Sequence, residues 1–169
     1  MEIKTYGDSC LSEASDKVKE FDCNLKKTIE DMKKTLRSQE GIGLAAPQVG
    51  INLRIFIMDV NYGKKNVKRK LQEFINPVII DESNEDVLSP EGCLSLPGIS
   101  ECVYRSSSIV LKYQDENGCE HISDFDEILS KCAQHEIGHL NGELFIDKLP
   151  KNKRMLLGSK LSDIRKGNG

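Results

Sequence analysis

The sequence lacks the features that would place a protein in a membrane or export it. Its longest apolar runs fall well short of the roughly 20 residues that a membrane-spanning helix needs. Its N-terminus also lacks the basic and then apolar layout of a secretory signal. We therefore expect an intracellular protein with no membrane partner. Its location would be the cytoplasm of a bacterial-type cell, or an organelle if the source is eukaryotic and a transit peptide has been removed.

A predominance of one charge is missing as well. The 24 basic and 27 acidic side chains give a formal net charge of −3, and no block of like charge is longer than a few residues. This balance argues against DNA or another nucleic acid as a partner. The most basic segment, residues 64–70 (KKNVKRK), lies between two apolar runs, and we expect it to form a solvated loop.

Length and cysteine content set further limits. A chain of 169 residues with 38% hydrophobic side chains can bury one core but is too short for two domains of ordinary size. A single domain over residues 1–169 is therefore expected. Because no export signal is present, the six cysteines are expected to be free thiols.

Apolar spacing predicts two main helices. Over residues 24–38, apolar side chains recur at intervals of three and four, which is typical of a helix with one buried face. A second helix is predicted from about Asp124 to Leu140, with Gly142 as a stop signal. Residues 157–164 show a weaker helical pattern, and the Lys-Gly-Asn-Gly end of the chain is expected to fray.

The remaining patterns predict strands and one unusual loop. Residues 51–60 and 74–80 are rich in apolar and β-branched side chains and are bounded by turn formers, as strands are. Residues 109–113 and the residues after Cys119 flank an Asp-Glu-Asn-Gly segment, where Asn-Gly supplies the positive φ angles of a tight hairpin. The segment 41–50 (GIGLAAPQVG) is predicted to be an ordered loop that approaches another group closely.

The strongest chemical signal is the run His135-Glu136-Ile137-Gly138-His139. Residues four apart project from one face of a helix, so these two imidazoles can hold one metal ion, and Glu136 can reach a water molecule beside it. The chain has only three histidines, so the pattern would rarely arise by chance. The alternative is a helix whose histidines only make hydrogen bonds.

A catalytic ion bound in this way needs a third protein ligand, which the pattern leaves open among carboxylates and cysteines. His121 lies beside the predicted hairpin and is not obviously placed to reach the ion. Cys93 lies within residues 90–98 (PEGCLSLPG), whose glycines and prolines predict a fixed loop. Its thiolate would complete a Cys-His-His site with one open position for water. From spacing alone, a cysteine that is simply a small buried hydrophobe is an equal alternative.

Three segments taken together resemble the signature motifs of the peptide deformylase family. They are GIGLAAPQ at 41–48, EGCLS at 91–95 and QHEIGH at 134–139, in that order. The resemblance implies an α+β fold in which small, mainly antiparallel sheets pack around a central helix that carries the HExxH motif. It also implies a metal-dependent hydrolase that removes the N-formyl group from the N-terminal methionine of nascent proteins and releases formate.

The resemblance also implies roles for individual residues. It implies that Cys93, His135 and His139 bind the metal. It also implies that Glu136 is the general acid and base, and that Gln48 and the backbone amide of Leu94 stabilise the oxyanion. The family is expected to use ferrous iron as the working ion, and zinc, nickel or cobalt would fit the same ligands. The implied partners are formyl-methionyl nascent peptides, with room for a transient ribosome contact, and we expect a monomer.

Substrate contacts are expected along the glycine-rich segment and the second helix. Backbone groups of Ile42 and Gly43 would pair with an extended peptide like an added strand. The expected substrate-binding residues are Ile42, Gly43, Gly92, Ile128 and Cys132, with ordinary core packing as the alternative for those that would line a methionine pocket. Behind the ligands, Arg105 is expected to lie close to the site and to pair with Glu91, although an ordinary surface arginine is the alternative.

Two positions depart from the family pattern. Gly138 replaces an aspartate that usually precedes the second histidine, and this change is expected to loosen the orientation of the ligands. Glu127 stands where a glycine is frequent at the start of the helix.

Two other classes of protein compete with this interpretation, namely a different HExxH hydrolase and a zinc-stabilised module without catalytic activity. A different HExxH hydrolase typically takes a histidine or carboxylate as its third ligand and does not need the segments at 41–48 and 91–95 together. A structural zinc module needs a fourth ligand, and none is evident in the sequence.

Overall fold

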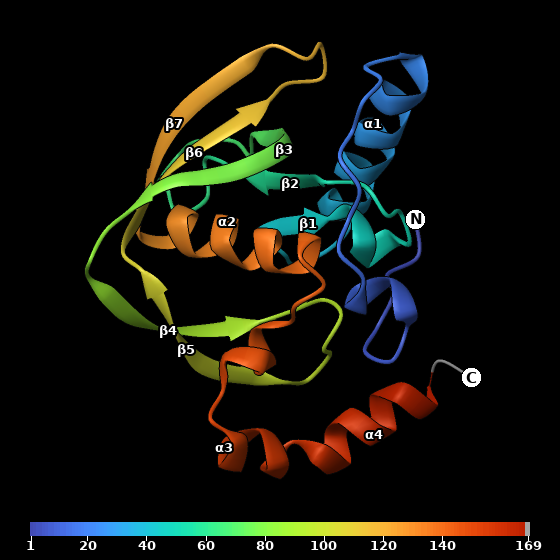
Figure 1. Ribbon diagram of the computed structural model, residues 1–169, viewed down its shortest axis with the longest axis vertical. Coiled ribbons are helices and arrows are strands. Elements are labelled where there is room, and N and C mark those ends of the chain that lie inside the picture. Colours follow the sequence, from blue (N-terminus) through green and yellow to red (C-terminus); the bar gives the residue numbers. More distant parts are fainter. Residues whose placement is uncertain (168–169) are drawn as a thin grey trace.

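The computed structural model describes residues 1–167, which form an α+β fold with two antiparallel sheets (Figure 1). The larger sheet has the strand order β1-β2-β3-β6-β7. Its strands are β1 (Gly43–Ala45), β2 (Ile55–Asp59), β3 (Leu71–Glu82), β6 (Ser108–Gln114) and β7 (Glu120–Asp126). The smaller sheet pairs β4 (Asp86–Gly92) with β5 (Ser100–Ser106). The expected fold class is confirmed.

The helices surround this pair of sheets, with one helix at the centre. The α-helices are α1 (Cys23–Arg37), α2 (Glu127–Leu140), α3 (Lys151–Leu156) and α4 (Gly158–Lys166), and the 3-10 helices are η1 (Ser9–Ser12), η2 (Ala46–Val49) and η3 (Phe145–Lys148). Helix α2, which carries the HExxH motif, lies between the larger sheet and the β4–β5 pair (Figure 1). Among the described residues, no helix has the length and apolar character that crossing a membrane would require.

Helix α1 forms where its apolar spacing predicts it. The side chain of Asp22 accepts a hydrogen bond from the Leu25 N–H group at 2.9 Å and so caps the first turn. The face that carries Leu25, Ile29, Met32 and Leu36 is buried. This face packs with residues of β2 in one of three apolar clusters, so α1 supports the larger sheet from the side opposite the motif helix.

A second cluster lies between α2 and the larger sheet. Phe74 stacks on Phe56 with ring centroids 4.6 Å apart, and Tyr113 packs on the same ring of Phe74 at 4.6 Å. Ala133 and Ile137 supply the helical side of this core. Because α2 is anchored on one face by apolar packing, its opposite face is available for polar groups.

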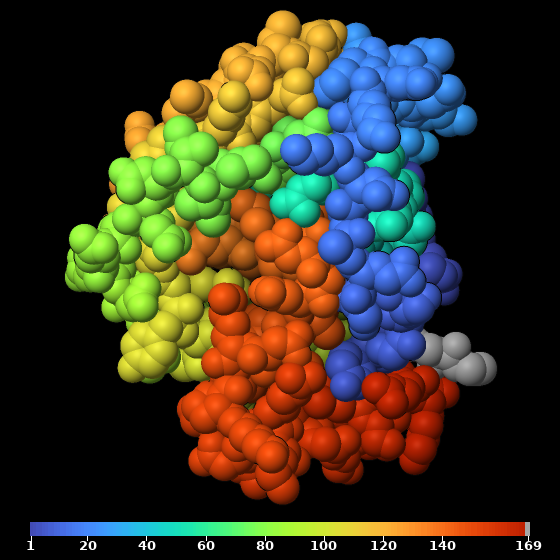
Figure 2. All heavy atoms as spheres, in the orientation of Figure 1, coloured from blue at the N-terminus to red at the C-terminus, as the bar shows by residue number. Residues whose placement is uncertain are grey.

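The N-terminal segment contacts both the end of α2 and the C-terminal helix α4. Figure 2 shows the N-terminal segment lying along the C-terminal end of α2, where the Ser15 N–H group donates to the Leu140 carbonyl at 2.8 Å. The guanidinium of Arg165 in α4 lies 5.2 Å from the centre of the Tyr6 ring. The helical pattern predicted over residues 157–164 is confirmed as α4, whereas α3 was not predicted. Of the end expected to fray, Lys166 is the last residue of α4, and residues 168–169 lie outside the described part of the chain.

Several element boundaries differ from the sequence predictions. The second helix begins at Glu127 rather than near Asp124, because residues 124–126 pair with β6 as part of β7. The prediction that 41–50 is only a loop is wrong, since it contains β1 and η2. The fixed loop predicted at 90–98 begins only at Cys93, because Pro90 lies in β4. A proline fits there because the β4–β5 sheet has only two strands, so one side of each strand makes no ladder bonds.

The hairpin between β6 and β7 forms as predicted, but its turn is longer. Five residues, 115–119, separate the two strands, and Gly118 has a φ of +81° whereas Asn117 does not have a positive φ. Asp115 organises this loop by accepting hydrogen bonds from the backbone N–H groups of Asn117 and Cys119. His121 pairs with Asp115 at 2.9 Å and so belongs to this hairpin.

The prediction of free thiols is confirmed for the six cysteines, all of which lie in the described region.

Candidate active site

Three expected metal ligands from two parts of the chain come together at the centre of the molecule. His135 and His139 project from the same face of α2, with ring centroids 5.0 Å apart. Cys93, the first residue after β4, places its Sγ atom 3.2 Å from Nε2 of His139. One ligand atom from each of the three residues lies within 4.8 Å of the others. Among the described residues, this is the group of histidine, cysteine or acidic side chains suited to hold a metal ion.

The donor set fits a divalent ion. Zinc, for example, binds a thiolate at about 2.3 Å and an imidazole nitrogen at about 2.0–2.1 Å, so two such ligands of one ion lie less than about 4.4 Å apart. The Cys93–His139 separation falls within that limit. Nδ1 of His135 already donates to a carboxylate, which leaves its Nε2 atom for a metal. Three protein ligands leave a fourth position open, as in catalytic rather than structural sites.

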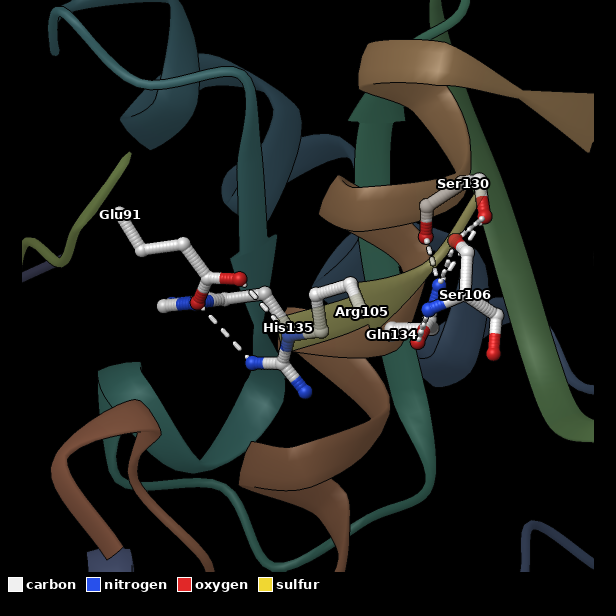
Figure 3. Close-up of polar contacts among 6 residues, drawn as sticks. All are labelled: Glu91, Arg105, Ser106, Ser130, Gln134 and His135. Carbon is white, nitrogen blue, oxygen red and sulfur yellow. Dashed lines mark hydrogen bonds and ion pairs between the residues drawn. The ribbon is translucent and has the colours of Figure 1, made fainter. Parts of the chain in front are cut away.

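A buried ion pair stands behind His135 (Figure 3). The Nε and Nη2 groups of Arg105 donate to the two carboxylate oxygens of Glu91 at 2.7 and 2.9 Å. The same carboxylate accepts a hydrogen bond from Nδ1 of His135 at 2.8 Å. The expected pairing of Arg105 with Glu91 is therefore present, and it orients the first histidine. Arg105 is only 5% exposed, so it is not an ordinary surface arginine.

The surroundings of Glu91 and Cys93 favour the ionised forms of both side chains. Burial alone would raise the pKa of Glu91, but the hydrogen bonds from Arg105 and His135 lower it to about 2. Burial opposes ionisation of the Cys93 thiol too, yet the neighbouring charges and hydrogen bonds of His139 and His135 hold its pKa well below the usual value. A thiolate is the form in which cysteine binds metals. The surroundings of Cys93 therefore favour the thiolate form that a metal ion would need.

The carboxylate of Glu136 is buried beside the candidate metal ligands with one oxygen left without a hydrogen bond from the described residues. The side chain is buried, and its Oε2 atom has no hydrogen-bond partner among the described residues. Burial raises the pKa of Glu136 to about 7, against the opposing effect of the two histidines. A carboxyl group with that pKa can both accept and release a proton near neutral pH.

Gln48 enters the site from η2 with its orientation fixed. Its Oε1 atom accepts a hydrogen bond from the Ala45 N–H group at 2.9 Å, so its Nε2 group points the other way. Nε2 donates to Ser95 Oγ at 3.2 Å and to Cys93 Sγ at 3.4 Å. The amide donor of Gln48 therefore lies beside the candidate metal ligands.

A cavity of about 630 Å³ opens onto this cluster. Of the residues predicted from the sequence, it is lined by Ile42, Gly43, Gln48, Glu91, Gly92, Cys93, Leu94, Ile128, Cys132, His135 and Glu136. His139 and Arg105 are not among its lining residues; they lie behind it. Tyr62 and Lys131 also line the cavity and were missed by the sequence predictions. Lys131 follows Ile128 by three positions on α2, and this spacing was the available signal.

Strand β1 forms an edge of the larger sheet and borders the cavity. The Ile42 carbonyl accepts a hydrogen bond from Asp59 N–H at 2.9 Å, so it faces β2. Because hydrogen-bonding directions alternate along an antiparallel strand, the N–H and carbonyl groups of Gly43 face the free edge. Of the two expected peptide-pairing residues, Gly43 is thus the one whose backbone groups remain available there.

The basic segment 64–70 does more than form a solvated loop. Most of its side chains are exposed, as expected. Arg69, however, pairs with the buried carboxylate of Asp59 at 3.1 Å and donates to the Gly41 carbonyl at 2.7 Å. This segment therefore holds the start of the glycine-rich segment that borders the cavity.

Comparisons with known proteins agree with this geometry. The family model described as polypeptide deformylase matches residues 1–155. A peptide deformylase from Cytophaga hutchinsonii is 37% identical over 167 residues, which cover 98% of this chain and 91% of that protein. One from Thermotoga maritima is 43% identical over 162 residues, which cover 96% and 94%. The crystal structure of Arabidopsis thaliana peptide deformylase 1B superposes with a TM-score of 0.91 at 32% identity, covering 99% of this chain and 92% of that one. This chain belongs to the polypeptide deformylase family.

Proposed function

We propose that Cys93, His135 and His139 hold one divalent metal ion and that Glu136, Gln48 and Leu94 act on a formylated peptide beside it. The chain is a hydrolase of the peptide deformylase family, which removes the N-formyl group from nascent proteins and is metal-dependent. The observation that carries the residue assignment is the meeting of one thiolate and two imidazoles beside a buried carboxylate at the floor of a cavity. Residues 1–169 act here as one catalytic domain.

The ion is proposed to be ferrous iron in the cell, with zinc, nickel or cobalt able to occupy the same ligands. One thiolate and two imidazoles suit all of these ions. When bound, such an ion supplies a Lewis acid and lowers the pKa of a bound water molecule to about 7. Metal analysis after anaerobic purification, compared with turnover, identifies the working ion.

Glu136 moves the proton. As the water oxygen attacks the formyl carbon, the carboxylate of Glu136 takes a proton from that water. The protonated carboxyl group then gives the proton to the leaving nitrogen as the C–N bond breaks. Formate and a free methionine amino group result. A pKa of about 7 matches both steps near neutral pH.

Gln48 and Leu94 stabilise the charge that forms on the formyl oxygen. The Nε2 group of Gln48 is held in place by the hydrogen bond between Ala45 N–H and Gln48 Oε1, so it needs no reorganisation during the reaction. The Leu94 backbone amide belongs to the residue that follows the metal ligand Cys93. Each such donor typically contributes about 3 kcal/mol to stabilising the transition state.

The substrate is proposed to bind as an extended strand along β1. The free backbone groups of Gly43 pair with it, and Gly92, which lines the same cavity, also contacts it. Ile42, Ile128 and Cys132 form the pocket for the methionine side chain. The natural partners are formyl-methionyl nascent chains, and the enzyme contacts the ribosome transiently. The enzyme acts as a monomer.

The decisive experiment measures formate release from a formyl-methionyl peptide by the metal-loaded protein and by three variants. Cys93→Ser should lose metal and activity together. Glu136→Gln should keep the metal but lower kcat by about 10²- to 10⁴-fold. His121→Ala is the matched control, because that histidine belongs to the β6–β7 hairpin, and it should retain both properties.

The same experiment separates the rival interpretations. Cleavage of unformylated peptides without formate release would identify a different HExxH hydrolase. Unfolding on chelation with no turnover would identify a structural zinc module. Either result would overturn the proposed function.

A further inference from the structure

Gln134, the residue before the first histidine, has no part in the proposed chemistry, yet its side chain makes a dense set of contacts. Its Oε1 atom accepts a hydrogen bond from the Ser106 N–H group at 3.2 Å, and its Nε2 group donates to the Ser106 carbonyl at 2.9 Å. The amide thus binds both backbone polar groups of one residue, as a neighbouring strand would. Ser106 is the last residue of β5 and follows Arg105 directly.

Ser130, one turn earlier on α2, reinforces this contact (Figure 3). Its hydroxyl donates to the Ser106 carbonyl at 3.0 Å and lies 3.0 Å from Nε2 of Gln134. Ser130 is fully buried and Ser106 is 7% exposed, so water does not readily replace these bonds. The Ser106 carbonyl has two donors, whereas its N–H group has Gln134 as its hydrogen-bond partner among the described residues.

These contacts close a ring of interactions between α2 and the smaller sheet. From Gln134 the ring runs through Ser106 to Arg105 along β5, then through the ion pair to Glu91 on β4. From Glu91 it returns to α2 at His135, the neighbour of Gln134. Figure 3 shows the two sets of contacts side by side, with Arg105 and Ser106 adjacent on the strand.

The ring has a physical consequence for the metal ligand. The direction of the His135 ring depends on the Glu91 carboxylate, whose own position depends on Arg105. An arginine side chain reaches a given point only if its backbone is held, and the Gln134 amide holds that backbone at the adjacent residue. Groups that orient a metal ligand typically change metal affinity or activity by 10- to 100-fold when they are removed.

We propose that Gln134 is a positioning residue, which locks the end of β5 onto α2 and thereby sets the Arg105–Glu91 pair that orients His135. This inference rests on the proposed function for its effect on catalysis. Ser130 acts in the same ring as an auxiliary donor. Gln134 itself does not touch the substrate cavity or the metal ligand atoms.

The test compares the wild type with two variants. Gln134→Met keeps the side-chain length but removes both hydrogen bonds to the Ser106 backbone. Ser130→Ala removes one of the two donors to the Ser106 carbonyl. Zinc affinity, measured by chelator competition, should fall about 10-fold in Gln134→Met and less in Ser130→Ala. The kcat for formate release should fall in the same order with KM unchanged, because the substrate contacts remain. The His135 Nδ1–H resonance, measured by NMR with and without zinc, should shift or broaden in Gln134→Met.

Ile109→Val serves as the control for a general loss of stability, because Ile109 is a buried core residue on β6 and its apolar side chain takes part in none of the hydrogen bonds of the ring. It should lower the melting temperature yet leave zinc affinity, kcat and the His135 resonance unchanged. Wild-type values of all three quantities in a folded Gln134→Met protein would overturn the inference. The failure of the wild type to bind zinc or release formate would instead overturn the proposed function, and the His135 resonance of the metal-free protein would still decide the role of Gln134.

Discussion

The carboxylate of Glu136 occupies the space that a side chain at Gly43 would fill. A Cβ atom at position 43 would overlap Oε1 of Glu136 and would lie 2.8 Å from the Cys132 sulfur. Strand β1 can therefore border the cavity and approach α2 this closely only with glycine at this point. The sequence suggested that Gly43 serves peptide pairing, and its lack of a side chain also makes room for the proposed general acid and base.

Gly43→Ala is expected to abolish most of the activity. The added methyl group would displace Glu136, and a displacement of about 1 Å at a reacting group can lower the rate by about 100-fold. Formate release and melting temperature are the measurements. Gly41→Ala is the matched control, because its Cβ atom would make contacts no closer than 3.4 Å and should be tolerated. Equal activity in the two variants would show that the close approach of β1 to Glu136 has no role.

Replacement of Gly138 should separate helix stability from ligand orientation. A Cβ atom there would meet the Glu143 carbonyl at 3.6 Å, an ordinary contact. Gly138→Ala should therefore raise the free energy of unfolding by up to about 1 kcal/mol.

Gly138→Asp should bind metal at least as tightly as the wild type, because Nδ1 of the adjacent His139 lacks a hydrogen-bond partner among the described residues. Markedly weaker binding in a chelator titration would contradict this role for an acid at position 138.

Glu127 begins α2 in a strained conformation. Its φ of +46° lies in the left-handed region, which costs a residue with a Cβ atom about 1–2 kcal/mol. Glycine relieves this cost but loses more entropy on folding, so Glu127→Gly should raise the free energy of unfolding by about 0.5 kcal/mol. Urea unfolding measures the change. Asp124→Gly, at an exposed position of β7, is the control and should lower stability; a similar loss in both variants would refute the strain at Glu127.

The buried carboxylate of Glu91 predicts a specific acid sensitivity. Its folded-state pKa of about 2 lies below its ordinary value of 4.5, so its ionised form stabilises the fold above pH 4.5. That contribution is lost as the pH falls from 4.5 towards 2. The stability advantage of the metal-free wild type over Glu91→Gln should therefore shrink across this window in chemical unfolding experiments. An advantage that stays constant with pH would show that Glu91 is not held ionised by Arg105 and His135.

Local patterns in the sequence predicted the helices well and the strands less well. The apolar spacing of α1 follows from its own residues, so its predicted bounds agree with the structure to within one residue. Strands β4 and β5 were missed because their pairing joins residues that are distant along the chain, such as Val87 and Arg105. Residue Pro90 also argues against a strand when no partner is known.

What the sequence alone determines, and what only the tertiary structure decides, depends on how far apart along the chain the interacting residues lie. Helical periodicity places His135 and His139 on one face with Glu136 beside them, because a turn of helix is a local structure. The three motifs identify the family. The distance from Cys93 to these histidines, the burial that raises the pKa of Glu136 and the ring through Gln134 all depend on contacts between segments far apart in the chain. Such contacts exist only once the two sheets have packed around α2, so only the tertiary structure decides them.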